Sequence, residues 1–177
     1  MSRLRRIEKS RFLGREFLLW LWYYSEQHNS VFPLGEHGEV EVFLDDKIVL
    51  EPLHGEGNRN LLSGLTPATS PEATIALQLN KIPSEVKLKL VKDARAWALS
   101  LKGDDLQIRS LKIPEVLSHT EEEKVYERLY LLDEFESMFQ ELLKTFLRLR
   151  LTEAWSAEVD LIRQWIREKS DEISHLR

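Results

Sequence analysis

FLGREFLLWLWYYSE, residues 12–26, is the most unusual stretch of the chain, and the rest of the fold must accommodate it. Its uninterrupted apolar and aromatic run extends from Phe17 to Tyr24. A helix over this run is apolar on nearly every side, and such helices are usually buried under other elements or under another chain. Gly14 lets another backbone approach the helix closely, at some cost in helix propensity. The stretch predicts a helix covered on more than one side.

The same run is too short to cross a membrane, because a spanning helix needs about 20 residues. It is also unlike a secretory signal, since bulky aromatic residues precede Ser25 where a small-residue cleavage site would be needed. We therefore expect no membrane partner and a cytoplasmic location.

The aromatic side chains of this helix have two alternative uses, core packing and contact with a protein partner or a homo-oligomer. Because a helix beside a sheet ordinarily buries one stripe, we expect some of these rings to meet carboxy-terminal helices and the remainder to meet another chain. Trp22 and Tyr23 are the favoured partner contacts. The candidate partner-binding residues are Trp20, Trp22, Tyr23 and Tyr24.

Length and composition predict a single α+β domain. The 177 residues are 42% hydrophobic and 31% charged, which is enough apolar material for one substantial core. We expect a basic amino-terminal arm over 1–11, a helix and sheet region over 12–117 and a helical region over 118–177. The absence of cysteine excludes disulfides, thiol nucleophiles and cysteine-based zinc sites.

Charge is concentrated at the amino terminus. Residues 1–15 carry six cations against Glu8 alone, a net of +5, so the other residues carry −10 of the formal net charge of −5. A basic arm of this kind is typical of a phosphate contact, and the alternative is a solvated start to the first helix. The candidate nucleic-acid-binding residues are Arg3, Arg5, Arg6, Lys9, Arg11 and Arg15.

Alternating apolar residues beyond the first helix predict an antiparallel sheet of about five or six strands. The pattern over 40–44, a turn at 45–47 and a return over 48–50 indicate a hairpin. EVKLKLV (85–91) and RAWALSL (95–101) indicate a second hairpin. Further short strands are expected at 61–65 and after Leu106.

Two helical regions flank this sheet in the sequence. TSPEATIALQLNKIP (69–83) predicts a short helix, capped by Ser70 and followed by Pro83, whose apolar face carries Ile75, Leu77 and Leu79. Thr120 and Glu123 fit a capping box at the start of a long amphipathic helix.

The long helix is expected to be the first arm of an αα-hairpin, and the alternative is one continuous or kinked helix, because no glycine marks the boundary. Thr152 can cap its second helix. The acidic outer positions predict a solvated face. They are Glu121, Glu122, Glu127, Asp133, Glu134 and Glu141.

Residues typical of catalysis are sparse. A carboxylate and imidazole group near the first hairpin could in principle hold a divalent cation, but Asp-Asp is ordinary turn chemistry and the spacing is not specific. Its members are His37, Asp45, Asp46 and His54. There is no phosphate-cradling glycine motif, no GxSxG and no HExxH. We therefore expect no catalytic residues, no metal site and no cofactor.

Five segments, taken in order, carry a family resemblance: FLGREFLLWLWYYSE, VEVFLDDKIVLE, TSPEATIALQLNKIPSEVKLKLV, RAWALSLKGDDLQI and YERLYLLDEFESMF. Together, over residues 12–166, they resemble the carboxy-terminal portion of long RdgC-like, recombination-associated bacterial proteins. The resemblance lies in segment order and in no catalytic signature. It implies a bacterial, nucleoid-associated protein whose relatives form ring-like dimers around duplex DNA and restrain the recombinase filament. The ring-forming body of that family has no counterpart in these segments.

Two functions follow from these observations. The resemblance and the basic amino terminus favour a non-enzymatic, DNA-associated accessory protein, although the net charge of −5 argues against extensive phosphate contact. The alternative is a protein-interaction or assembly module without direct DNA contact, which would explain the aromatic helix and the acidic carboxy-terminal region.

Overall fold

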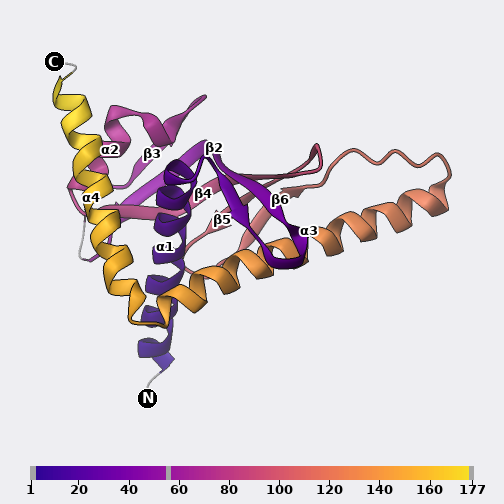
Figure 1. The fold of residues 1–177 in the computed structure, drawn as a ribbon, viewed down its shortest axis with the longest axis horizontal. Helices are drawn as coiled ribbons and strands as arrows, with labels where there is room; N and C mark the ends of the chain where they lie inside the picture. Colours follow the sequence, from indigo (N-terminus) through magenta and orange to yellow (C-terminus); the bar gives the residue numbers. More distant parts are fainter. Residues whose placement is uncertain (1–2, 55–56, 176–177) are drawn as a thin grey trace.

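An antiparallel sheet of six strands forms one layer of the fold and helices form the other (Figure 1). The structure, a computed structural model, describes the backbone of residues 3–54 and 57–175 and the side chains of residues 13–54 and 57–172. The helices are α1 (Arg3–Gln27), α2 (Pro71–Gln78), α3 (Glu121–Arg150) and α4 (Ala154–His175). The strands are β1 (Val31–Pro33), β2 (Glu39–Pro52), β3 (Asn60–Ser63), β4 (Lys81–Lys92), β5 (Arg95–Lys102) and β6 (Ile108–Lys112). The predicted α+β class is confirmed.

The sheet has the order β1-β2-β4-β5-β6, and β3 also pairs with β2. All pairs are antiparallel, and the predicted second hairpin is the β4–β5 pair. Its turn places Asp93 and Ala94 at φ values of 49° and 62°, as a two-residue hairpin turn of the primed type requires. The apolar residues of β4 and β5 that face the helices are buried. They are Val86, Leu88, Leu90, Trp97, Leu99 and Leu101.

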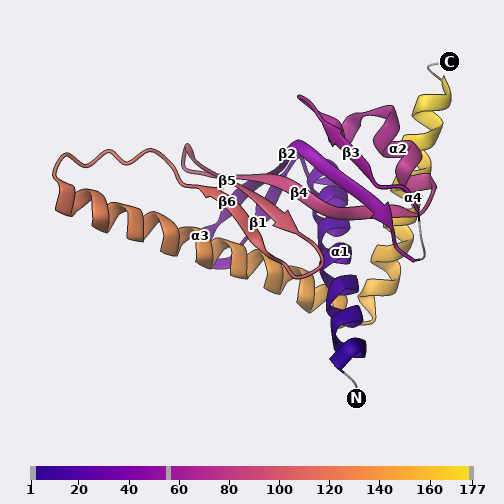
Figure 2. The same ribbon diagram turned by 180° about the vertical axis from the view of Figure 1, so that it is seen from behind.

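Helices α1, α3 and α4 lie on one side of the sheet, and the opposite side is open when the molecule is seen from behind (Figure 2). α1 lies between the sheet and the carboxy-terminal helices, and one continuous hydrophobic core joins all three. α3 and α4 form the predicted helix pair and diverge from their shared turn (Figure 1). The long α1 helix is therefore the centre of the core.

The local capping predictions hold at two helices. The Ser70 hydroxyl accepts a hydrogen bond from the Ala73 N–H with Pro71 at the first position of α2, and Thr120 and Glu123 form a reciprocal capping box at α3. At α4 the Thr152 hydroxyl donates to the Leu149 carbonyl instead, so the predicted side-chain cap is replaced by a bond to the end of α3.

The predicted first hairpin is wrong, because β2 runs without a turn from Glu39 to Pro52. Between Leu44 and Ile48 it carries two more residues than β4 carries opposite, and this bulge absorbs the Asp-Asp-Lys segment. Lys87 of β4 lies 2.8 Å from the Asp46 carboxylate and 3.8 Å from that of Asp45. A cation on the neighbouring strand thus compensates the two carboxylates in the bulge.

The predicted apolar face of α2 is also partly wrong. Ile75 and Leu79 are 42% and 64% exposed, whereas Ala73, Ala76 and Leu77 are buried. The face toward the core is lined mainly by small side chains, because α2 packs close to its neighbours. The sequence pattern favoured large apolar residues. It therefore assigned Ile75 and Leu79 to the buried face and missed Ala73 and Ala76.

Gly14 has the role expected from the sequence. A Cβ atom at this position would lie 1.9 Å from the carbonyl oxygen of Gly103, far inside van der Waals contact. The turn after β5 therefore crosses α1 at its glycine, and the two backbones meet without a side chain between them.

Gly14→Ala is expected to destabilise the protein by about 1 to 3 kcal/mol, because overpacking outweighs the gain of roughly 1 kcal/mol in helix propensity. Urea unfolding measures the effect, with the exposed α3 substitution Gln140→Ala as a control that should be nearly neutral. A Gly14→Ala variant more stable than the wild type would contradict the contact.

Candidate functional site

The aromatic residues of α1 are buried within this chain. Trp20, Trp22 and Tyr23 are 1%, 0% and 7% exposed, and Tyr24 is half-buried. Trp20 packs against Phe146 of α3 with ring centroids 5.6 Å apart. The expectation that some of these rings meet the carboxy-terminal helices is confirmed, but Trp20, Trp22 and Tyr23 leave almost no exposed surface for another chain.

The indole N–H groups of Trp20 and Trp22 are satisfied by acidic residues. Glu26 accepts hydrogen bonds from the indole N–H groups of Trp22 and Trp165 at 2.7 and 2.9 Å, and its carboxylate lies 2.8 Å from Lys169 Nζ. Trp20 donates to Glu158 at 3.2 Å. These contacts fasten α1 to α4 and use the rings of Trp20 and Trp22 for internal packing.

The predicted basic arm is only partly within the described structure. Arg15 pairs with Glu51 at 2.9 Å and with Asp104 at 2.7 Å, and its side chain is only 11% exposed. This residue is a structural tie between α1 and the sheet and is unsuited to phosphate contact. The side chains of the other five candidates, Arg3, Arg5, Arg6, Lys9 and Arg11, lie outside the described residues.

A different group of cations lies on the side of the sheet that faces away from the helices. Side chains alternate along a strand, so Lys87 and Lys89 point away from the buried Leu88 and Leu90. Residues paired across neighbouring strands share a face. Strand pairing therefore forms two rows of residues across β4, β5 and β6. The first row is Lys89–Ala98–Lys112 and the second is Lys87–Ser100–Arg109. We call these six residues the outer sheet face.

The outer sheet face carries its cations on two strands, with small residues on the strand between them. Its cations stand on β4 and β6, about 10 Å apart, and the rows are about 7 Å apart along the strands. The residues of β5 between these cations are the small Ala98 and Ser100. Lys89 and Lys112 are exposed, and neither has an ion-pair partner among the described side chains. Phe43 of β2 continues the first row beyond Lys89.

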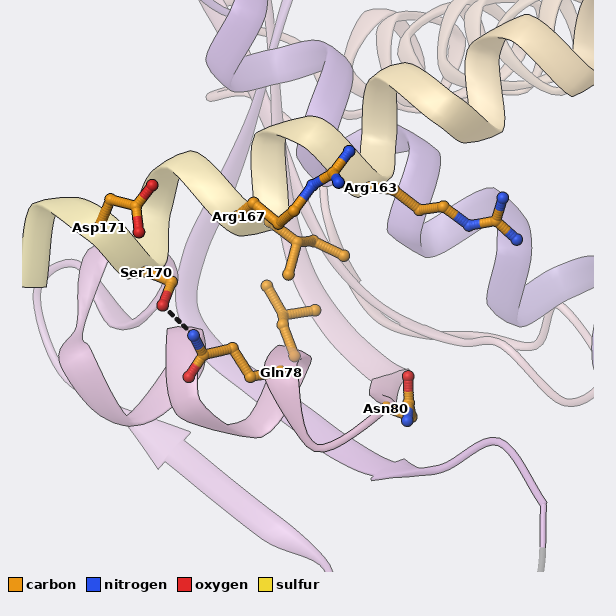
Figure 3. A pocket seen from close by; sticks show the side chains of 8 residues that line it. Gln78, Asn80, Arg163, Arg167, Ser170 and Asp171 are labelled. Carbon is orange, nitrogen blue, oxygen red and sulfur yellow. Dashed lines mark hydrogen bonds between the residues drawn. The ribbon is translucent and has the colours of Figure 1, made fainter.

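A second feature is a cleft between α2 and α4 (Figure 3). Its outer part, about 500 Å³, is lined by Arg163 and Arg167 of α4, with Gln78 and Asn80 opposite. The Gln78 side-chain amide donates to the Ser170 hydroxyl at one end. An inner part of about 310 Å³ adjoins it, because both are lined by Leu77, Asn80, Arg163 and Ile166. We call the two parts the α2–α4 cleft.

A third feature is the amino-terminal half of α3, which projects beyond the sheet (Figures 1 and 2). Large apolar side chains in this half remain 41–65% exposed. They recur at steps of three or four and so lie on one side of the helix. These residues, the α3 stripe, are Val125, Tyr126, Leu129, Tyr130 and Leu132. The sheet ends before it can cover this part of α3.

The acidic positions of α3 are not all solvated, contrary to expectation. Glu134 is 8% exposed and binds Lys92 at 3.1 Å and Arg95 at 2.8 Å, which ties α3 to the β4–β5 hairpin. Glu127 accepts hydrogen bonds from the backbone N–H groups of Leu117 and Ser118 at 3.0 and 2.8 Å. These two carboxylates organise the neighbouring structure.

Two of the residues considered for a metal site have other partners in the fold. The His37 ring lies 2.8 Å from the Ser137 hydroxyl, and Asp46 pairs with Lys87. Within the described ranges, no group of three or more histidine or acidic residues is arranged to hold a metal ion.

No protein-family model matches this chain, and no curated protein matches it. The resemblance to RdgC-like proteins therefore stays a prediction. Among residues 3–54 and 57–175, no helix combines the length and apolar character needed to cross a membrane.

Acidification is expected to release the segment before α3. Hydrogen bonds to Ser118 and Leu117 hold the pKa of Glu127 below its ordinary value of 4.5. Because the folded pKa is lowered, the stabilisation is complete above the ordinary value and is lost as pH falls through the folded value. NMR of the Leu117 and Ser118 amides should show a transition below pH 4.5.

Glu127→Gln should reproduce the acid-state shifts of these amides at pH 7, and Glu122→Gln should leave them unchanged. A transition of the two amides above pH 4.5 would contradict this assignment.

Proposed function

We propose that this chain is a non-enzymatic, DNA-associated accessory protein that contacts phosphates through the outer sheet face. The observation that carries the proposal is the placement of Lys89, Arg109 and Lys112 on an uncovered side of the sheet. The resemblance to RdgC-like proteins supports the same class of function and adds recombination as its setting.

The chemistry of the face suits a nucleic-acid backbone. Cations supply most of the affinity for phosphates, while the small side chains of Ala98 and Ser100 allow a nucleic-acid strand to approach β5 between them. Phe43 offers a half-buried ring at one end, where a base could stack. Asp45 and Asp46 partly neutralise Lys87, so the three other cations should provide most of the attraction. The net charge of −5 limits the contact to this local face.

The decisive experiment compares three triple variants in DNA binding over a salt series. Lys89→Glu, Arg109→Glu and Lys112→Glu together should lower affinity at low salt at least about tenfold, and should reduce the magnitude of the salt slope by about 2 to 3, close to one unit per lost phosphate contact. The loss should be similar for all DNA sequences, because phosphate contacts carry no base information. Fluorescence anisotropy with duplex and single-stranded oligonucleotides measures both quantities.

Two further triple variants separate this face from the alternatives. The first carries Glu at Arg128, Lys144 and Arg148, exposed cations of α3, and should lose little affinity despite the same change in net charge. The second carries Glu at Arg3, Arg5 and Arg6 and tests the basic arm. Wild-type protein that fails to bind DNA at low salt would refute the proposal. Loss of DNA affinity in the arm variant alone would indicate that the contact lies at the amino terminus instead.

A second candidate function is docking of a protein partner, and the α3 stripe is the observation that favours it. Contiguous exposed apolar surface on a soluble domain usually marks an interaction site. Carboxylates dominate the exposed positions around the stripe and outnumber Lys124 and Arg128. They are Glu121, Glu122, Glu123, Asp133 and Glu136. We infer that the partner is a cationic amphipathic helix, since a second copy of α3 would bring like charges together.

Tyr126→Gln with Leu129→Gln should weaken binding of a synthetic helical leucine–lysine peptide at least about tenfold, because apolar anchors dominate such interfaces. The matched control replaces the exposed Leu61 and Leu65 of another surface with Gln and should bind normally. A leucine–glutamate peptide of the same pattern should not bind. Fluorescence anisotropy measures peptide binding, and light scattering measures the mass of the protein in solution. A doubled mass that is lost in the Tyr126→Gln, Leu129→Gln variant would favour a second copy of the chain as the partner instead.

A further inference from the structure

The α2–α4 cleft has an apolar interior and a cationic mouth. The inner part is walled by side chains from α1, α2, β4 and α4, and the combined cleft falls within the size range of small-molecule sites. Its apolar lining consists of Leu19, Leu53, Leu77, Ile82, Trp155, Val159, Ile162 and Ile166. Of these, Leu77, Ile82 and Ile162 are less than a tenth exposed. Such a lining favours an apolar group over water.

Positive charge lies in both parts of the cleft, and Arg163 lines both of them. Arg163 and Arg167 lie one turn apart on α4 and line the outer part together, and Figure 3 shows both leaving the helix beside the cleft. Arg167 has no ion-pair partner among the described side chains, and Arg163 shares its charge with the exposed Asp160 at 3.0 Å. Lys81 adds a third cation at the inner part and donates to the Asn60 side chain.

Two acidic groups also line the cleft. Glu16 at the inner part lies 2.7 Å from Arg150, which compensates its charge. Asp171 lines the far end of the outer part. Arg163, which lines both parts together with Asn80, therefore lies where a ligand that enters the inner part would leave its polar end, and Arg167 adds a cation in the outer part.

We propose that the α2–α4 cleft binds a small organic anion with an apolar tail. The tail lies in the inner part among Leu19, Val159 and Ile162, and the anionic head lies at Arg163 and Arg167. The proposal is independent of DNA binding, because the cleft lies among the helices and the outer sheet face lies on the opposite side of the sheet.

The test is calorimetric titration of the full chain with monomeric octanoate, compared with octan-1-ol, octyltrimethylammonium and acetate. Octanoate should bind at least about tenfold more tightly than the other three, because only octanoate has both the tail and the negative head. Equal binding of octanol or of the cationic probe would overturn the proposal, as would the absence of octanoate binding.

Two variants locate the site. Arg163→Ala with Arg167→Ala should weaken octanoate at least about tenfold and leave octanol unchanged, and both residues are exposed, so folding is preserved. Val159→Trp should fill the inner part and weaken both probes. Arg128→Ala with Arg148→Ala on α3 is the matched control. Octanoate binding that survives both the arginine pair substitution and Val159→Trp would place the site elsewhere and refute the assignment.

Discussion

The burial of α1 is the constraint on which the rest of the structure depends. A helix with apolar residues on nearly every side cannot be satisfied by a sheet alone, which covers one stripe. The carboxy-terminal helices supply the second surface. There the ring centroids of Phe146 and Phe17 are 5.2 Å apart, and those of Trp165 and Trp22 are 5.5 Å apart. α1 therefore decides the order of the layers and brings the amino-terminal and carboxy-terminal helices into contact.

Burial of tryptophan rings also requires acceptors for their N–H groups, since an unpaired buried donor costs about 1 to 3 kcal/mol. Trp97 donates to the Leu131 carbonyl of α3 at 2.9 Å, and Trp22 and Trp165 share Glu26. Lys169 lies near this carboxylate and over both rings of that pair. The aromatic layer is consequently held in one arrangement by directional bonds, whereas packing alone would permit several.

Short-range signals in the sequence predicted much of the fold. The caps at Ser70 and Thr120 and the alternation of β4 and β5 are local properties, and they survive in the structure. The β2 bulge could not be predicted in this way, because Lys87, which compensates its two aspartates, lies more than 40 residues away in the sequence. Periodicity likewise identified the apolar positions of α3 without revealing that the sheet ends before it reaches them.

The candidate sites were harder to predict than the fold, for a related reason. The alternating lysines of EVKLKLV had the pattern of a solvated strand face, and only the pairing with β6 brings them beside Arg109 and Lys112.

The helices cover a single side of the sheet, so polar residues are required on the other side. Solubility alone would be met by either sign of charge. Cations occupy this side at Lys87 and Lys89 of β4 and at Arg109 and Lys112 of β6, with Asp45 and Asp46 of β2 beside Lys87. The two chemically distinct surfaces, cationic strands and an acidic projecting helix, follow from one layer of helices that covers only one side of the sheet and extends beyond its edge.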